Sequence, residues 1–137
     1  MILAIDVGNS NIVLGGLDKD KIHFISRIAT DRQKTENEYA VIMRSIFHMN
    51  GVNADDFEGA IMSLVVPPLV TTLQNAVKSV IGKAPLLVEP GLKTGLNILI
   101  DNPAQLGADL VAGAVAAINK YPKPLVVIDM GTATTFS

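Results

Sequence analysis

Short apolar runs separated by polar turns make up the first thirty residues. Apolar residues dominate positions 2–7, 12–17 and 22–28, and the polar stretches 8–11 and 18–21 lie between them. Runs of this length, bounded by Gly, Asn, Asp or Ser, are typical of strands that tight turns connect. The pattern therefore predicts a three-stranded β-meander at the start of the chain.

Helical and strand patterns then alternate. Thr35 and Glu38 have the spacing of a capping box, and apolar residues recur after them at helical spacing as far as Phe47. The further predicted elements are a strand over residues 59–66, a helix with Pro67-Pro68 in its first turn and an apolar stripe over 70–81, a strand over 86–88, a helix over 104–119 and a strand over 125–129. The order βββαβα, followed by another helix and strand, predicts an α/β protein with a mixed β-sheet.

Composition narrows the class of protein. The 137 residues are 49% apolar and 18% charged, which favours a compact globular fold over a disordered chain. A net charge of −2 without a basic stripe argues against nucleic acid as a partner. The absence of cysteine excludes disulfides and thiolate chemistry. No apolar run reaches the roughly 18 residues of a membrane span, and no secretory signal follows Met1, so we expect a cytoplasmic protein without a membrane partner.

Two similar turns carry the candidate chemistry. Asp6 and Gly8 lie at the end of the first predicted strand, and Asp129 and Gly131 lie at the end of the last. A carboxylate at a strand end can hold Mg²⁺, directly or through water, while the backbone N–H groups of the turn bind phosphate oxygens. An ordinary hairpin also explains the first turn, and β-propensity explains the threonines after the second. The two together favour a pair of loops that clasp a triphosphate.

A third candidate is Gly107-Ala108-Asp109, near the start of the last predicted helix. A carboxylate there can accept the proton of a substrate hydroxyl that attacks a γ-phosphate. The alternative is structural, because the helix macrodipole favours acidic residues in a first turn.

These motifs resemble, in the same order along the chain, those of type III pantothenate kinases. The shared segments are DVGNSNIVLG, TDRQKTENEY, LVVP, PGLKTG, DNP, GAD and DMGTATT. The resemblance implies the amino-terminal half of an actin-like kinase. Residues 1–118 would form a first ribonuclease-H-like half-domain. Residues 119–137 would be a linker and the first strand of an otherwise absent second half-domain.

The resemblance also implies the site. The first phosphate loop would contain Asp6, Val7, Gly8, Asn9, Ser10, Asn11, Ile12 and Val13, and the second would contain Thr132. The pantothenate site would contain Ile100, Gly107, Ala108, Asp109 and Leu110, with Asp109 as the general base. Asp6 would hold Mg²⁺, and Asp129 would bind K⁺ or NH₄⁺. The implied function is phosphorylation of pantothenate by ATP to 4'-phosphopantothenate, the first step of coenzyme A biosynthesis, by a homodimer.

Three positions depart from the family pattern. Leu110 replaces a usual arginine, Ile100 a usual tyrosine, and Asn37 a usual acidic residue. Losing arginine removes a fixed cation and a fork of donors from the expected substrate pocket. The alternatives are therefore a catalytically inactive homologue or isolated domain that acts as a binding or assembly module, or a kinase for a different small hydroxylated substrate. A Rossmann-type domain is disfavoured, because Gly8 leads into a strand and not a helix.

Overall fold

The computed structural model of the chain describes residues 1–19, 21–89, 92–99, 102, 106–130 and 134–136. Contacts group the chain into two compact units, Met1–Leu87 and Val88–Ser137, and each unit is described by itself. None of the helices in the described part of the chain combines the length and the hydropathy that a membrane-spanning segment requires.

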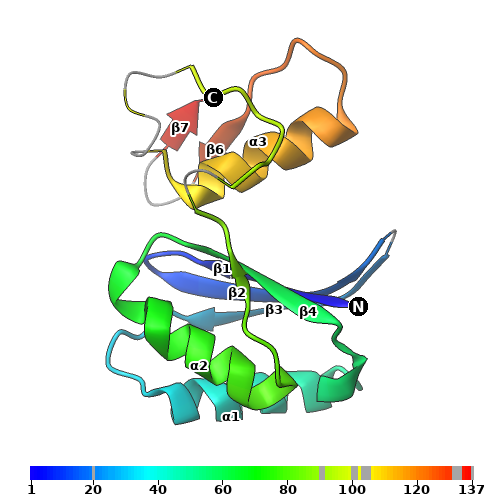
Figure 1. Cartoon of the computed structure of the whole chain (residues 1–137), viewed down its shortest axis with the longest axis vertical. Helices are drawn as coiled ribbons and strands as arrows, with labels where there is room; N and C mark the ends of the chain where they lie inside the picture. The colour runs from blue at the N-terminus through cyan, green and yellow to red at the C-terminus, as the bar shows by residue number, and fades with distance from the viewer. Residues whose placement is uncertain (20, 90–91, 100–101, 103–105, 131–133, 137) are drawn as a thin grey trace. The chain divides into compact units, whose positions relative to one another are not determined.

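The first unit is built on a mixed five-stranded sheet (Figure 1). Its strands are β1 (Ile2–Val7), β2 (Asn11–Asp18), β3 (Lys21–Ala29), β4 (Gly59–Leu64) and β5 (Leu86–Leu87), arranged in the order β3-β2-β1-β4-β5. The pairs β1–β2 and β2–β3 are antiparallel, whereas β1–β4 and β4–β5 are parallel. The predicted meander and the mixed α/β class are confirmed, and β1 lies at the centre of the sheet.

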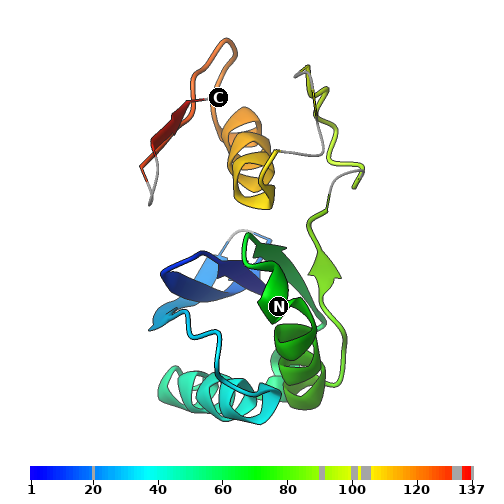
Figure 2. The same ribbon diagram turned by 90° about the vertical axis from the view of Figure 1, so that its left-hand side faces the viewer.

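Two helices, α1 (Glu36–Met49) and α2 (Val70–Ile81), cover one face of this sheet, as Figures 1 and 2 both show. The predicted capping box is present, because the Thr35 hydroxyl accepts from the Glu38 N–H while the Glu38 carboxylate accepts from the Thr35 N–H. The helix α2 follows a 3₁₀ turn, η2 (Pro67–Leu69), and ends at Gly82, whose φ of 73° is favourable only for glycine.

The core lies between the sheet and these helices. Side chains alternate along β1, so Leu3, Ile5 and Val7 are buried beneath the helices while Asp6 is exposed on the other face. From the helices, Tyr39 and Val77 are fully buried in the same cluster. Each such side chain contributes about 1.5–3 kcal/mol to stability on burial. The central strand β1 is therefore anchored in the core of the unit up to Val7, where the turn begins.

The second unit contains one helix and one small sheet. The helix is α3 (Ala108–Lys120), and the strands β6 (Ile128–Met130) and β7 (Thr134–Phe136) form an antiparallel pair. The structure does not test the predicted division of the chain into half-domains at residue 118, so this division stays a prediction.

Several predicted boundaries were wrong. The strand predicted over 59–66 ends at Leu64, because the prolines that follow start the 3₁₀ turn η2. The helix predicted from residue 104 begins at Ala108, since Gly107 has an extended conformation, and residues 103–105 lie outside the described part. The last strand lies over 128–130 instead of 125–129, and β7 was not predicted as an element. An apolar run alone does not reveal which of its residues find a hydrogen-bonding partner.

Candidate functional site

The turn between β1 and β2, residues 8–11, is short and closed on itself. The Gly8 N–H donates to the Asn11 carbonyl at 2.9 Å, directly beyond the last pair of the ladder, Val7 with Ile12. Both members of that pair are 0% exposed, so the two ends of the turn are anchored in the core. A side chain at residue 8 would place its Cβ 3.1 Å from the Asn11 carbonyl oxygen, which explains the glycine. Asn9, Ser10 and Asn11 are exposed at the surface.

Asp6 is exposed next to this turn, on the face of the sheet opposite the helices. Its register partners are Val13 on β2 and Ser63 on β4, so the three side chains share one face. Ser63 is 8% exposed, and its hydroxyl has no hydrogen-bond partner among the residues that the structure describes. The predicted residues Asp6 to Val13 therefore come together in one hairpin, and Ser63 is a neighbour that the sequence did not single out.

Residues just after β3 reach back to the turn. The Thr30 hydroxyl donates to the Gly8 carbonyl at 2.7 Å, and the Thr30 N–H donates to the Ser10 carbonyl at 3.0 Å. The Arg32 guanidinium donates to Oδ1 of Asn9 at 3.3 Å. Sequence reasoning used TDRQKTENEY for a capping box and as part of a resemblance, and it missed these contacts. The separation of about 22 residues along the chain left no local signal for them.

Charged groups stabilise the segment that provides Thr30 and Arg32. The Asp31 carboxylate accepts hydrogen bonds from Nζ of Lys34 at 2.7 Å and from the Gln33 N–H at 2.9 Å. The hydrogen bond from Lys34 is the larger cause, and together with the one from the Gln33 N–H it holds the pKa of Asp31 below its ordinary value. The hydrogen bond between Lys34 and Asp31 also raises the pKa of Lys34. Both side chains are partly exposed to solvent, so the effect of the pair on stability is small.

In the second unit, Asp109 lies in the first turn of α3. One of its carboxylate oxygens accepts from the Leu110 N–H at 2.9 Å, and both residues are half-buried. Gly107 occupies the N-cap and provides no side-chain cap, so among the first-turn N–H groups that of Leu110 is bonded by the Asp109 side chain instead. The predicted residues Gly107 to Leu110 thus share one helix start.

Asp129 is exposed on β6 and pairs with Thr135 of β7. The Thr135 hydroxyl is buried and has no partner in the described residues. The other two candidate residues, Ile100 and Thr132, lie outside the residues that the structure describes.

The described residues contain no cluster of three or more His, Asp or Glu side chains suited to a metal ion. Kinase sites often bind Mg²⁺ through only one or two carboxylates together with the phosphates of the nucleotide. An exposed carboxylate beside a tight turn fits that mode of binding. Asp6 is therefore compatible with Mg²⁺, although it does not form a metal site by itself.

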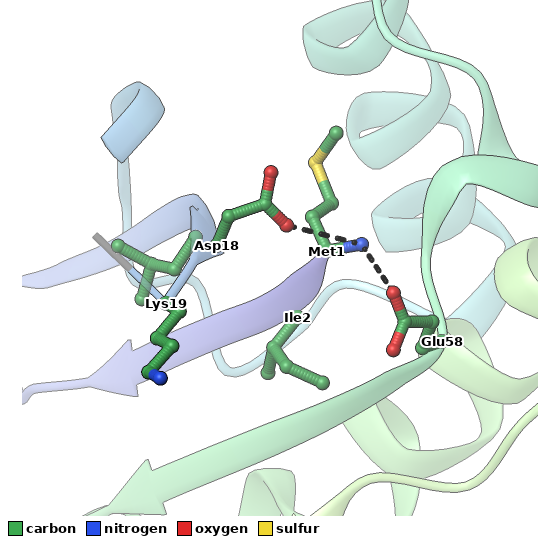
Figure 3. A pocket seen from close by; sticks show the side chains of 6 residues that line it. Met1, Ile2, Asp18, Lys19 and Glu58 are labelled. Atoms are coloured by element: carbon green, nitrogen blue, oxygen red, sulfur yellow. Dashed lines mark hydrogen bonds and ion pairs between the residues drawn. The ribbon is translucent and has the colours of Figure 1, made fainter. Parts of the chain in front are cut away.

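A pocket of about 550 Å³ lies at the opposite end of β1. Its lining residues are Met1, Ile2, Leu17, Asp18, Lys19 and Glu58. In Figure 3 the Met1 amine lies between two carboxylates, 3.1 Å from Glu58 and 3.5 Å from Asp18. The hydrogen bond with Glu58 is the main reason that the pKa of this amine is raised. The pocket includes none of the predicted site residues.

Comparison with known proteins identifies the family. A sequence model of a protein family described as type III pantothenate kinase matches residues 2–137. The chain belongs to the type III pantothenate kinase family. Three curated relatives named type III pantothenate kinase come from Exiguobacterium sibiricum, Halalkalibacterium halodurans and another Exiguobacterium strain. They are 46%, 48% and 47% identical over 136 residues.

Each of these alignments covers 99% of the chain and 54% of the relative. The chain therefore spans about half the length of the curated type III pantothenate kinases that it matches. Both Asp-x-Gly motifs and the start of α3 lie within the region that matches the family.

Proposed function

We propose that the chain is the amino-terminal half of an ATP-dependent kinase that phosphorylates pantothenate to 4'-phosphopantothenate, the first step of coenzyme A biosynthesis. The observation that carries the proposal is the turn at residues 8–11. It follows the central strand, both of its ends are anchored by fully buried residues, and Asp6 is exposed beside it. Membership of the family supports the choice of ATP and pantothenate as substrates.

We assign the first unit to a ribonuclease-H-like half-domain of the actin-like ATPases. The strand order β3-β2-β1-β4-β5 supports the assignment, because three antiparallel strands are followed by β4, parallel to β1, and by β5, parallel to β4. By this reading, residues 1–118 form the first half-domain. Residues 119–137 form the linker and first strand of the second half-domain, and Thr132 contributes to the second phosphate loop.

In the proposed mechanism, the turn orients the phosphates of ATP. The exposed Asn9, Ser10 and Asn11 provide side-chain donors, and the rigid backbone around Gly8 lets a phosphate approach closely. When bound, Mg²⁺ neutralises charge that develops on the phosphates, and Asp6 is the carboxylate that would hold it. Asp129 would bind K⁺ or NH₄⁺ near the second loop.

Asp109 is the proposed general base. Its carboxylate is half-buried at the start of α3 and bonded to the Leu110 N–H, which fixes its orientation for accepting the proton of the attacking hydroxyl. Gly107, Ala108, Leu110 and Ile100 would line the site of the acceptor.

The test is ATP turnover coupled to pantothenate in the presence of Mg²⁺ and K⁺. We would assay the chain itself and a chimera in which it is joined to the carboxyl-terminal part of the Halalkalibacterium relative. Pantothenate-dependent turnover that Asp109→Asn abolishes is the expected result. A soluble chimera that binds ATP but never phosphorylates pantothenate would refute the proposed substrate.

Leu110 favours one second candidate, a kinase that acts on a different small hydroxylated substrate. A leucine beside the proposed base offers an apolar surface where the family usually places a cation. A panel of small alcohols in the same assay distinguishes the two, because preference for pantothenate over every other acceptor excludes this candidate. Leu110→Arg is the matching variant, and it should improve the KM for pantothenate if the missing cation matters.

We also propose a homodimer in the cytoplasm. The helix α3 is rich in Ala and Val, and among its described residues none is fully buried, which leaves apolar surface for a second copy. Light scattering of the purified protein measures the oligomeric state, and a monomer at assay concentration would contradict the proposal.

A further inference from the structure

The segment between β3 and α1 (Figure 1) has no role in the function proposed above, yet three hydrogen bonds from it reach the turn at residues 8–11. Two hydrogen bonds from Thr30 fix the carbonyls of Gly8 and Ser10, and a third from Arg32 reaches the side chain of Asn9. Three consecutive residues of the turn are therefore held from one segment.

This segment is itself anchored in the core. The Tyr39 side chain is 0% exposed, and its hydroxyl donates to the Asp31 carbonyl at 2.6 Å and accepts from the Asp31 N–H at 3.1 Å. One buried hydroxyl thus fixes both polar groups of the Asp31 backbone. Thr30 and Arg32, the residues on either side, are placed against the turn by this anchor.

The Arg32 guanidinium makes few of the polar contacts that it could make within the described part of the chain. Its guanidinium has five N–H donors, and one of them bonds Asn9. In the described part of the chain the side chain is exposed and forms no ion pair with a carboxylate. A cation that is bonded to a phosphate-binding turn, and is not neutralised by Asp or Glu, suits an oxyanion. The planar fork of arginine matches phosphate oxygens in particular.

We propose that Thr30 and Arg32 complete the nucleotide site. Thr30 is a positioning residue that holds the backbone of the turn in its binding shape, and Arg32 binds phosphate oxygens of the nucleotide directly. The proposal rests on the nucleotide-binding function proposed above, and it assigns a role to a segment that the sequence alone left without one.

The first experiment measures the affinity of the full chain for Mg²⁺–ATP and for adenosine by calorimetry. Arg32→Gln should weaken ATP binding by about tenfold or more, as expected for a lost charge-assisted bond, and should leave adenosine binding unchanged. The control is Arg44→Gln. Arg44 is also exposed and donates one bond, to the Ser79 carbonyl at 3.3 Å, but it lies on α1. The control should bind ATP within about twofold of the original chain.

The second experiment separates positioning from general stability. Thr30→Val keeps the side-chain shape but removes the donor to Gly8, so ATP affinity should fall about threefold to tenfold. The backbone amide signals of residues 8–11 should shift in the NMR spectrum, and Thr30→Ser should restore both properties. Loss of thermal stability in Thr30→Val with unchanged ATP affinity would overturn the positioning role.

The outcomes distinguish this proposal from the proposed function. ATP binding that is insensitive to Arg32→Gln overturns the role of Arg32 and leaves the kinase function standing. ATP binding that depends on Arg32, without phosphorylation of any acceptor by the chimera, supports this proposal and overturns the kinase function. No ATP binding by either the chain or the chimera overturns both.

Discussion

Ser63 lies directly beside Asp6 in the parallel register of β1 and β4, and its hydroxyl is buried without a partner among the described residues. A buried hydroxyl without a hydrogen bond costs about 1–3 kcal/mol. Such a cost, at the edge of the proposed nucleotide site, is typical of residues that are kept for binding and not for stability.

Ser63→Ala should therefore raise the free energy of unfolding by up to about 1 kcal/mol while weakening Mg²⁺–ATP binding. Urea denaturation and calorimetry measure the two effects. A clear loss of stability in this variant would show that the hydroxyl has a partner in the folded protein. Thr71→Ala, at an exposed position of α2, is the control and should leave nucleotide binding unchanged.

Gly16→Ala should destabilise the first unit. The new Cβ would lie 2.5 Å from one carbon of the Phe24 ring and 2.9 Å from another, and Phe24 is itself buried against Phe47. Relieving such a clash in a packed core costs about 1–3 kcal/mol. The neighbouring Gly15→Ala is a matched control, because its Cβ would meet only the Phe24 carbonyl at 3.5 Å. Thermal unfolding of both variants tests the prediction, and equal midpoints would contradict it.

Tyr39→Phe should loosen the segment after β3 with little effect on core volume. The change removes one hydroxyl that serves both the N–H and the carbonyl of Asp31, and leaves these groups to find other partners. We expect a loss of about 1–2 kcal/mol and faster amide hydrogen exchange at Asp31. Tyr121→Phe, at an exposed position, should have no effect on either quantity. Unchanged exchange at Asp31 would show that the anchor lies elsewhere.

The capping box of α1 should make stability depend on pH. Two hydrogen bonds from Thr35, the larger effect from its N–H and the smaller from its hydroxyl, hold the pKa of Glu38 below its ordinary 4.5. A carboxyl whose folded pKa is lowered stabilises the fold above its unfolded pKa, and this stabilisation is lost as pH falls through the folded value.

The stability difference between the original chain and Glu38→Gln should therefore be largest near neutral pH and shrink on acidification below about pH 4.5. Urea denaturation over this range measures the difference. A difference that stays constant or grows at low pH would rule out the ionised carboxylate as the cause.

Elements of the first unit could be predicted because their signals are local. The strands of the meander follow from apolar runs and turn residues, and the start of α1 follows from the spacing of Thr35 and Glu38. The hairpin that contains Asp6 and Gly8 followed from the same reasoning, and the structure contains this hairpin.

What escaped prediction depends on contacts that are distant in sequence. The bonds from Thr30 and Arg32 to the turn require β3 to pair with β2, and the position of Ser63 requires β4 to lie beside β1 in one register. The partner of β6 was missed as well, since the three residues of β7 carry no periodic pattern long enough to indicate a strand.

The central position of β1 has a consequence for synthesis of the protein. The antiparallel strands β1, β2 and β3 are complete once Ala29 has left the ribosome, but β1 gains its parallel neighbour only with the segment from Gly59 to Leu64. At a synthesis rate of about 5–20 residues per second, the edge of β1 stays unpaired for a time on the order of seconds. During that interval the nascent meander exposes an unpaired strand edge and apolar side chains. Surfaces of this kind are bound by chaperones and promote aggregation.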